Sequence, residues 1–360
     1  MKPVTPTPLP AAAELLSLLH GIRGRFVLSG QHNQPMHGSA WTERITALTG
    51  SEPAVWGGEI GFSAAGTLDG VDRRPATIAE AVRAHGRGAV IVITWHAVCP
   101  LDDEPVTFDG GILRSFDPAD FDVLFDPTST LHGRWAAQVD VAAGFLRELQ
   151  DAGVPVIWRP YHEMNGPWFW WGGQPARSRA LWRLLFSRLV DHHGLVNLLW
   201  LWNPNAPYGS AGPIEDHYPG HNVVDLLGVD VYGSRYDQRF HDQLLALAGG
   251  RPIALGEVGG LPGPRVLDAQ PGWCWYMAWP EQVIAENPEG LAGTTTDPRV
   301  LDLPGLRSLR WPGSAEASGA APCPGSAGLT AGTGRPQPYP SPIAGPPVSV
   351  VRDTPAEEPS

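Results

Sequence analysis

The chain has 360 residues, which is enough for one large barrel domain or two domains of ordinary size. Its formal net charge is −12, and only 17% of its residues are charged, against roughly 25% in typical soluble domains. We therefore expect no nucleic-acid partner, because neutralising phosphates requires clustered Lys and Arg. An acidic chain of this kind suits a neutral substrate.

The cysteine content and the hydropathy of the chain show whether disulfides, a zinc site or a membrane span are to be expected. The three cysteines, Cys99, Cys274 and Cys323, give no disulfide framework and no CxxC pair for zinc, and they leave a Cys99–Cys274 bridge open. No apolar run approaches the roughly 18 residues of a membrane span, so we expect no membrane partner. The N-terminus lacks the order of a signal peptide, which leaves a cytoplasmic protein or a secreted one without its leader. We expect a monomer.

Eight short apolar runs recur along the chain, and each ends in polar residues. Runs of this length are typical of parallel strands that are buried on both faces. They cover residues 25–32, 54–61, 89–96, 154–163, 197–205, 223–232, 252–259 and 272–279. Because helical patterns lie between several of them, the sequence predicts a (β/α)8 TIM barrel, with an open parallel sheet as the alternative.

Periodicity and capping signals predict the helices between these runs. Thr77 begins 77–87 with Glu80 three residues later, the pattern of a capping box. Residues 131–150 carry one apolar stripe at helical spacing, which includes Trp135. Further helices are expected at 177–190, 235–248, 262–270 and 297–309, and glycines that fit helix C-termini stand at 88, 153, 194 and 250.

Composition divides the chain into three parts. Residues 1–19 are expected to form an N-terminal extension, 20–311 the barrel and 312–360 a disordered tail rich in Pro, Gly and Ala. The Asp-rich segment 97–130 follows the third apolar run. We expect it to be a structured insertion that forms one wall of a cleft.

Polar side chains stand at the C-terminal ends of the predicted strands, where barrel enzymes place their active sites. They are Gln31, His32, Glu59, His96, His162, Glu163, Asn203, Asn205, Asp230, Tyr232 and Glu257. Glu163 ends the fourth strand and Glu257 the seventh, so the two carboxylates should face each other across the mouth of the barrel. Glycoside hydrolysis needs such a pair, one group protonating the leaving oxygen and the other attacking the anomeric carbon.

The two glutamates also need different proton affinities. A nearby ionised Glu257 would raise the pKa of Glu163 and keep it an acid, and Tyr232 could steady Glu257 by a hydrogen bond. The plain alternative is that both glutamates form unrelated salt bridges. Strand-end residues His32, His96, His162 and Glu59 also leave a metal-dependent hydrolase open, although histidine donating to sugar hydroxyls is the favoured role.

The stretch 159-RPYHEMNGPWFWWGG-173 concentrates aromatic residues after the fourth strand. Within strands, Trp158, Trp200 and Trp275 are expected to pack the barrel. The aromatics from 168 to 171 should be half exposed on a loop that serves as a platform for sugar rings. We expect one or two of these four to contact sugar and the others to hold the loop in place.

This stretch resembles the acid/base signature of glycoside hydrolase family 26, whose members are mostly β-mannanases. The matching residues are His162, Glu163, Gly166, Trp168, Phe169, Trp170, Trp171 and Gly172. The resemblance implies that Glu163 is the acid/base, that Trp168 lines the cleft and that Glu257, in 252-PIALGEVGG-260, is the nucleophile.

Shorter matches extend the resemblance over about residues 20–310. The motif 94-TWH-96, with Trp95 and His96, resembles the third-strand motif that contacts the sugar, and 229-VDVYG-233 resembles the one whose tyrosine, here Tyr232, bonds the nucleophile. Trp279 falls where the family has a tryptophan under the same sugar. Two departures concern the cleft: Cys99-Pro100 stands where Asn-Pro is common, and Glu59 where Asp is common.

The sequence therefore predicts a retaining endo-β-1,4-mannanase without a cofactor. Its catalytic residues are Glu163 and Glu257, and its expected substrate-binding residues are His96, His162, Trp168, Tyr232, Trp279, Trp95 and Glu59. The alternatives are a mixed-linkage β-glucanase, a β-1,3-xylanase or a mannobiose-releasing exo-mannanase with the same mechanism, and, more distantly, a non-catalytic glycan-binding barrel.

Overall fold

The computed structural model describes residues 2–61, 70–233, 235–279, 283 and 290–309. Eight parallel strands form a closed barrel, because β1 pairs with both β8 and β2. These strands are β1 (Val27–His32), β2 (Val55–Glu59), β3 (Val90–Trp95), β4 (Val156–Pro160), β5 (Leu198–Trp202), β6 (Leu226–Val231), β7 (Ile253–Val258) and β8 (Trp273–Ala278). Each lies inside one predicted apolar run, and the predicted (β/α)8 fold is confirmed.

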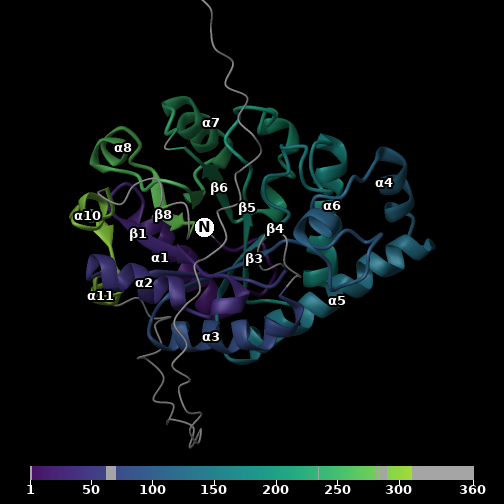
Figure 1. The fold of residues 1–360 in the computed structure, drawn as a ribbon, viewed down its shortest axis with the longest axis horizontal. Helices are drawn as coiled ribbons and strands as arrows, with labels where there is room; N and C mark the ends of the chain where they lie inside the picture. The colour runs from purple at the N-terminus through teal and green to yellow at the C-terminus, as the bar shows by residue number, and fades with distance from the viewer. Residues whose placement is uncertain (1, 62–69, 234, 280–282, 284–289, 310–360) are drawn as a thin grey trace, which may run out of the picture. The chain divides into compact units, whose positions relative to one another are not determined.

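Helices surround the strands, as Figure 1 shows. They are α1 (Pro10–Ile22), α2 (Ala40–Thr49), α3 (Arg74–Gly86), α4 (Pro118–Phe125), α5 (Thr130–Asp151), α6 (Pro175–Ser187), α7 (Gln238–Ala248), α8 (Pro264–Ala269), α10 (Gly290–Thr295) and α11 (Leu303–Ser308). No helix within the described ranges is both long and apolar enough to cross a membrane.

Two predicted helix boundaries are wrong. α3 begins at Arg74 with Pro75 in its first turn and has no side-chain cap, so Thr77 lies buried inside the helix and forms no capping box. Proline fits the first turn because no intrahelical partner is needed for its missing N–H. The predicted helix 297–309 divides into β9 (Val300–Leu301), which pairs with the start of β1, and α11.

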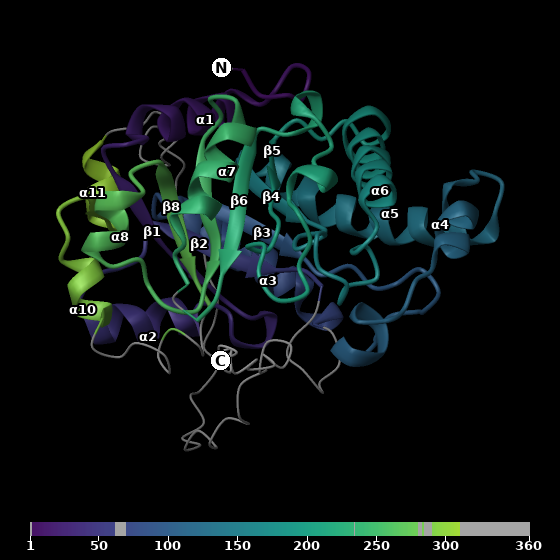
Figure 2. The same cartoon turned by 90° about the horizontal axis from the view of Figure 1, so that it is seen from above.

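Helix α1 closes the N-terminal end of the barrel. Its buried residues Leu15, Leu16 and Leu19 belong to one apolar cluster with side chains of the strands, and Figure 2 shows the helix across one end of them. Just before the helix, Leu9 N–H donates to Val196 O at 2.7 Å, next to the start of β5. The predicted extension 1–19 therefore contains most of a helix that covers the barrel floor, whereas the predicted tail, 312–360, lies outside the described residues.

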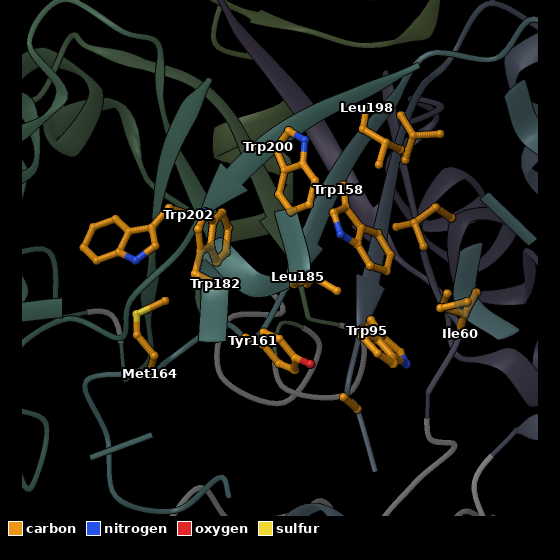
Figure 3. Close-up of a cluster of buried hydrophobic side chains, with 14 of the residues drawn as sticks. Ile60, Trp95, Trp158, Tyr161, Met164, Trp182, Leu185, Leu198, Trp200 and Trp202 are labelled. Atoms are coloured by element: carbon orange, nitrogen blue, oxygen red, sulfur yellow. The ribbon is translucent and has the colours of Figure 1, made fainter. Parts of the chain in front are cut away.

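A second apolar cluster fills the space between the barrel and its helices. Trp158 and Trp200 are fully buried in it, and Figure 3 shows them beside Trp182 of α6 and Trp95 of β3. The Trp182 and Trp200 rings lie 5.7 Å apart, centroid to centroid, in an edge arrangement. The expectation that Trp158, Trp200 and Trp275 pack the barrel is confirmed, since each is at most 1% exposed.

The segment 97–130 is structured, as expected. It contains a π-helical turn at Phe108–Ile112 and helix α4. Glu104 accepts a hydrogen bond from Arg74 Nη1 at 2.8 Å, which ties the segment to α3. Cys99, at its start, is a buried free thiol, and so is Cys274, so these two cysteines do not form a bridge.

Replacing Leu15 with Ala tests the role of α1. Leu15 is fully buried, so we expect Leu15→Ala to lower the free energy of unfolding by about 2–5 kcal/mol. The control is Ser17→Ala on the exposed side of the same helix, which should change it by less than about 0.5 kcal/mol. Denaturant unfolding measures the free energy of unfolding of both variants. If Leu15→Ala lowered it by no more than the control, by less than about 0.5 kcal/mol, α1 would not stabilise the barrel.

Candidate active site

Alternation along the strands explains why polar groups gather at one end of the barrel. Successive strand residues point to opposite faces, so every second residue shares a face. Val92, Ile157 and Leu201 belong to the cluster under α1. Two residues further along the chain from each stand Thr94 in β3, Arg159 in β4 and Asn203 just after β5, all buried. The interior of the barrel therefore changes from apolar at its floor to polar at the C-terminal ends of its strands.

The structure brings Glu163 and Glu257 together at this end. Glu257 lies in β7, and Glu163 follows β4 by three residues. Together with Asp230 of β6, each offers a carboxylate oxygen that lies within 4.8 Å of the others. The backbone at Glu163 is left-handed, with φ of 53°, and its N–H donates to Asn203 O at 2.7 Å. Non-glycine residues adopt this conformation rarely, so the surrounding contacts must hold Glu163 in place.

Arg159 of β4 lies between two of these carboxylates. Its Nη1 donates to Glu257 Oε1 at 2.8 Å, and its Nη2 donates to Asp230 Oδ2. Burial by itself lowers the pKa of Arg159, but the charges of Asp230 and Glu257 outweigh it and raise the pKa above its usual range. The guanidinium therefore stays charged and holds one oxygen of Glu257 in place.

Tyr232 holds the other oxygen of Glu257. Its hydroxyl donates to Glu257 Oε2, as the sequence predicts, and its own N–H donates to Tyr208 Oη at 3.0 Å. Burial raises the pKa of Tyr232 well above its usual value, and the charge of Glu257 raises it further. Tyr232 therefore remains a hydrogen-bond donor at neutral pH.

The environment of Glu163 raises its pKa. Burial, followed by the charge of Glu257, raises the pKa of Glu163 to about 8, and hydrogen bonding from Trp168 opposes this rise. Trp168 Nε1 donates to Glu163 Oε2 at 2.8 Å. The expected direction of the pKa is thus found, although burial is a larger cause than the neighbouring carboxylate. Glu163 keeps its proton at neutral pH.

Three strand-end histidines line the same region. The rings of His96 and His162 lie 4.3 Å apart, centroid to centroid, and His162 Nε2 is 3.9 Å from Glu257 Oε1. His96 Nδ1 lies 2.7 Å from Glu59 Oε2. Burial lowers the pKa of His32, His96 and His162 well below the usual value, so each ring is neutral. The carboxylate of Glu59 is thus placed to hold the ring of His96.

The aromatic loop is less exposed than the sequence predicts. Of its four aromatic residues, only Trp168 is partly exposed, whereas Phe169, Trp170 and Trp171 are buried. The indole of Trp170 donates to Ala97 O at 2.8 Å and that of Trp171 to His162 O at 2.7 Å. The three buried rings therefore hold the loop in place, and Trp168 alone offers a face beside Glu163.

The remaining predicted aromatics divide between the site and the core. Trp279 is partly exposed and stacks on His32 with ring centroids 4.3 Å apart. Trp95 is buried in the layer outside the barrel and lies near Trp158 (Figure 3). The centroids of the two rings are 6.0 Å apart. The structure thus brings every predicted site residue to the polar end except Trp95, which points to the opposite face of β3.

A cation has little room among these groups. Glu163, Asp230 and Glu257 are close enough to share one, but the guanidinium of Arg159 already binds two of the three. The strand-end histidines and Glu59, considered above as metal ligands, do not form a set of three mutually close donor atoms in the described parts of the chain.

Two residues of the site gain roles that sequence reasoning missed. Arg159 has no role in the sequence analysis, yet it binds Glu257 and Asp230. Asn165 donates to Asn205 O and accepts from Asn205 N–H, both at 2.8 Å, which joins the loops after β4 and β5. The sequence does show that Arg159 is a charged residue on the same face of its strand as Ile157, and this could have indicated a buried partner for it. No pattern in the sequence pairs Asn165 with Asn205.

Comparison with known proteins agrees with this geometry. Residues 4–301 match the model of glycosyl hydrolase family 26. A mannan endo-1,4-beta-mannosidase of Thermothelomyces thermophilus is 34% identical over 81% of this chain and 61% of its own length.

Solved structures share the fold. GH26A from Muricauda sp. MAR_2010_75 has a TM-score of 0.79 and 37% identity, covering 84% of this chain and 99% of that one. The Podospora anserina GH26-CBM35 beta-(1,4)-mannanase has a TM-score of 0.72 and 30% identity, covering 86% of this chain and 69% of that one.

The chain spans only part of the first curated relatives: 61% of the Thermothelomyces protein and 46% and 49% of two mannosidases from Piromyces sp. The match nevertheless extends over the whole barrel, from the segment before α1 to β9. With the two strand-end glutamates in place, the chain belongs to glycosyl hydrolase family 26.

Proposed function

We propose that the chain is a retaining, endo-acting β-1,4-mannanase. The observation that carries the mechanism is the separation of the two glutamates, whose nearest carboxylate oxygens lie within 4.8 Å of each other. Retaining glycosidases have carboxyl groups about 5–5.5 Å apart, whereas inverting ones need about 6.5–9.5 Å to admit a water molecule. Oxygen atoms this close fit the shorter spacing of retaining enzymes, which supports direct attack by one carboxylate.

In the first step, Glu257 attacks the anomeric carbon and the bond to the leaving oxygen breaks. Glu163 gives its proton to that oxygen, so the leaving sugar departs as a neutral alcohol. Arg159 and Tyr232 each hold one oxygen of Glu257, which fixes the carboxylate for attack. The product of this step is a glycosyl ester on Glu257 and an ionised Glu163.

In the second step, Glu163 takes a proton from water, and the water oxygen attacks the anomeric carbon. The ester bond breaks, and Glu257 returns as a carboxylate. The negative charge of Glu257 is absent from the ester, so one cause of the raised pKa of Glu163 disappears during this step. The pKa of Glu163 is therefore higher before the first step, where it must carry a proton to donate, than in the ester, where it must be ionised to act as the base.

The assignment of mannan as substrate is supported by the relatives. The Thermothelomyces relative is a mannan endo-1,4-beta-mannosidase, and the Podospora structure is a beta-(1,4)-mannanase. We assign sugar contacts to Trp168, Trp279, His96, His162 and Tyr232, which line the region around the two glutamates. Glu59 acts through His96 by fixing the orientation of its ring.

A panel of polysaccharides tests the proposed substrate. The wild-type chain should cut mannan and galactomannan into oligosaccharides of mixed length and leave mixed-linkage glucan and β-1,3-xylan largely intact. Glu257→Ala should lower the rate on the order of 10⁴-fold because the nucleophile is lost, with an unchanged circular dichroism spectrum. Product sizing and reducing-end release measure both.

Glu148→Gln, an exposed change on α5, serves as the matched control and should keep the wild-type rate. Release of mannobiose alone from the earliest times would contradict endo action. Near wild-type hydrolysis by Glu257→Ala would contradict the role of Glu257, and preference for another polymer would replace mannan as the substrate.

The pH dependence tests Glu163 as the acid. It works in its protonated form, so kcat/KM should fall as the pH rises through its pKa of about 8. Trp168→Phe keeps an aromatic ring but removes the N–H that stabilises the Glu163 carboxylate, so the pKa of Glu163 should rise. Hydrogen bonds to charged groups contribute about 1.5–3 kcal/mol, which corresponds to a shift of about one pH unit or more.

The alkaline limb of the kcat/KM profile of Trp168→Phe should therefore move to higher pH. Its acid limb serves as the internal reference. A limb that stays in place, or that moves to lower pH, would show that another group controls the protonation needed for catalysis.

A further inference from the structure

A second cluster of ionisable side chains lies on the outside of the barrel, where α5 packs beside the end of α6 (Figures 1 and 2). Helix α6 continues into a π-helical turn, Arg188–His192, and His193 N–H donates to Arg188 O at 3.0 Å. Such single π turns occur often at functional sites. This one ends six residues before β5 begins, so it lies toward the N-terminal ends of the strands, away from the glutamates.

Three contacts fix the turn against α5. Asp140 accepts from Arg188 Nε at 2.8 Å and from Arg188 Nη2 at 2.7 Å. Arg147 donates to the backbone carbonyl of His193, and Gln150 Oε1 accepts from Val196 N–H at 2.7 Å. The side chains of the turn therefore have a fixed backbone to project from.

Three side chains that can bind a metal ion lie close together where the turn packs against α5. Asp140, His192 and His193 each offer a ligand atom, and these three atoms lie within 4.8 Å of one another. Adjacent side chains on a regular α-helix do not face each other. Here the rings of His192 and His193 lie 4.8 Å apart, centroid to centroid, at 86°, and His193 Nε2 lies 2.7 Å from Asp140 Oδ1.

Solvent reaches this cluster. Asp140 and His192 are exposed, and His193 is partly exposed. His192 also borders an open groove, whose lining includes His132 and Trp135 of α5 and Ser187, Arg188 and Asp191 of the facing segment. An ion held by the three groups would therefore keep open positions for water.

We propose that Asp140, His192 and His193 bind a divalent transition-metal ion, with Zn²⁺ as the best fit. Imidazole nitrogen and carboxylate oxygen are ligands that Zn²⁺ takes at about 2.0–2.2 Å, whereas Ca²⁺ and Mg²⁺ prefer sites made of oxygen alone. The ion takes Asp140 Oδ1 and so replaces the hydrogen bonds of this oxygen with His193 Nε2 and Arg188 Nε, while Arg188 Nη2 keeps its bond to Oδ2. The nearby guanidinium charge limits the affinity, and the bound ion joins α5 to the end of α6.

Calorimetric titration of the full chain with ZnCl2 at pH 7.5 tests the site. The wild type should bind one Zn²⁺ at this site, and His192→Ala, His193→Ala and Asp140→Asn should each weaken that binding at least tenfold. His221→Ala, a change of an exposed histidine outside the cluster, is the matched control and should bind as the wild type does. Thermal unfolding should shift upward with ZnCl2 and return after EDTA is added, because the ion binds the folded state.

Two further readouts separate this site from the catalytic one. All three variants should hydrolyse mannan at the wild-type rate, and CaCl2 or MgCl2 should give no thermal shift. His192→Ala keeps the test valid if the other variants are unstable, because it removes only an exposed ring. Equal Zn²⁺ affinity in the wild type and in His192→Ala, or a thermal shift that persists in that variant, would overturn the proposal.

Discussion

The contact between the Arg159 guanidinium and the carboxylates of Asp230 and Glu257 is the interaction on which the active end of the barrel depends. Three carboxyl groups lie within 4.8 Å of one another there, and all are largely buried. Three carboxylates at this distance would repel one another and take up protons if no buried positive charge lay beside them. Breaking one buried ion pair by removing a partner typically costs about 3–5 kcal/mol, so this guanidinium is important to folding as well as to chemistry.

That contact also separates the roles of the two glutamates. Glu257 receives hydrogen bonds from Arg159 and Tyr232, which fix both of its oxygens. Glu163 accepts the indole N–H of Trp168 and hydrogen-bonds with Asp230, and its pKa is raised, first by burial and then by Glu257. Two identical side chains thus differ because of the donors around them, and the buried aromatic loop keeps this difference by fixing the backbone on which Glu163 stands.

Much of this arrangement is predictable from the sequence, because strand ends in a parallel barrel meet at one edge. The runs that end in Glu163 and Glu257 therefore place both residues correctly. Other features depend on pairings that no local pattern contains. Arg159 looks like the end of an apolar strand until its partners in β6 and β7 are known, and Trp95 differs from a site residue only by which face of β3 it occupies.

Helix α1 was missed because prolines surround its apolar patch, although Pro10 stands in the first turn, where proline is tolerated. The exposure of Phe169, Trp170 and Trp171 was overestimated because their acceptors are backbone carbonyls of other segments.

The stereochemistry of hydrolysis tests the central claim most directly, since it depends on whether the two carboxylates are too close to admit a water molecule between them. Proton NMR of a mannan oligosaccharide digest, recorded before mutarotation, identifies the anomer that is formed first. The close pair of Glu163 and Glu257 predicts that the β-anomer appears first and later equilibrates with the α-anomer. Initial appearance of the α-anomer would show a single displacement by water and would contradict the account.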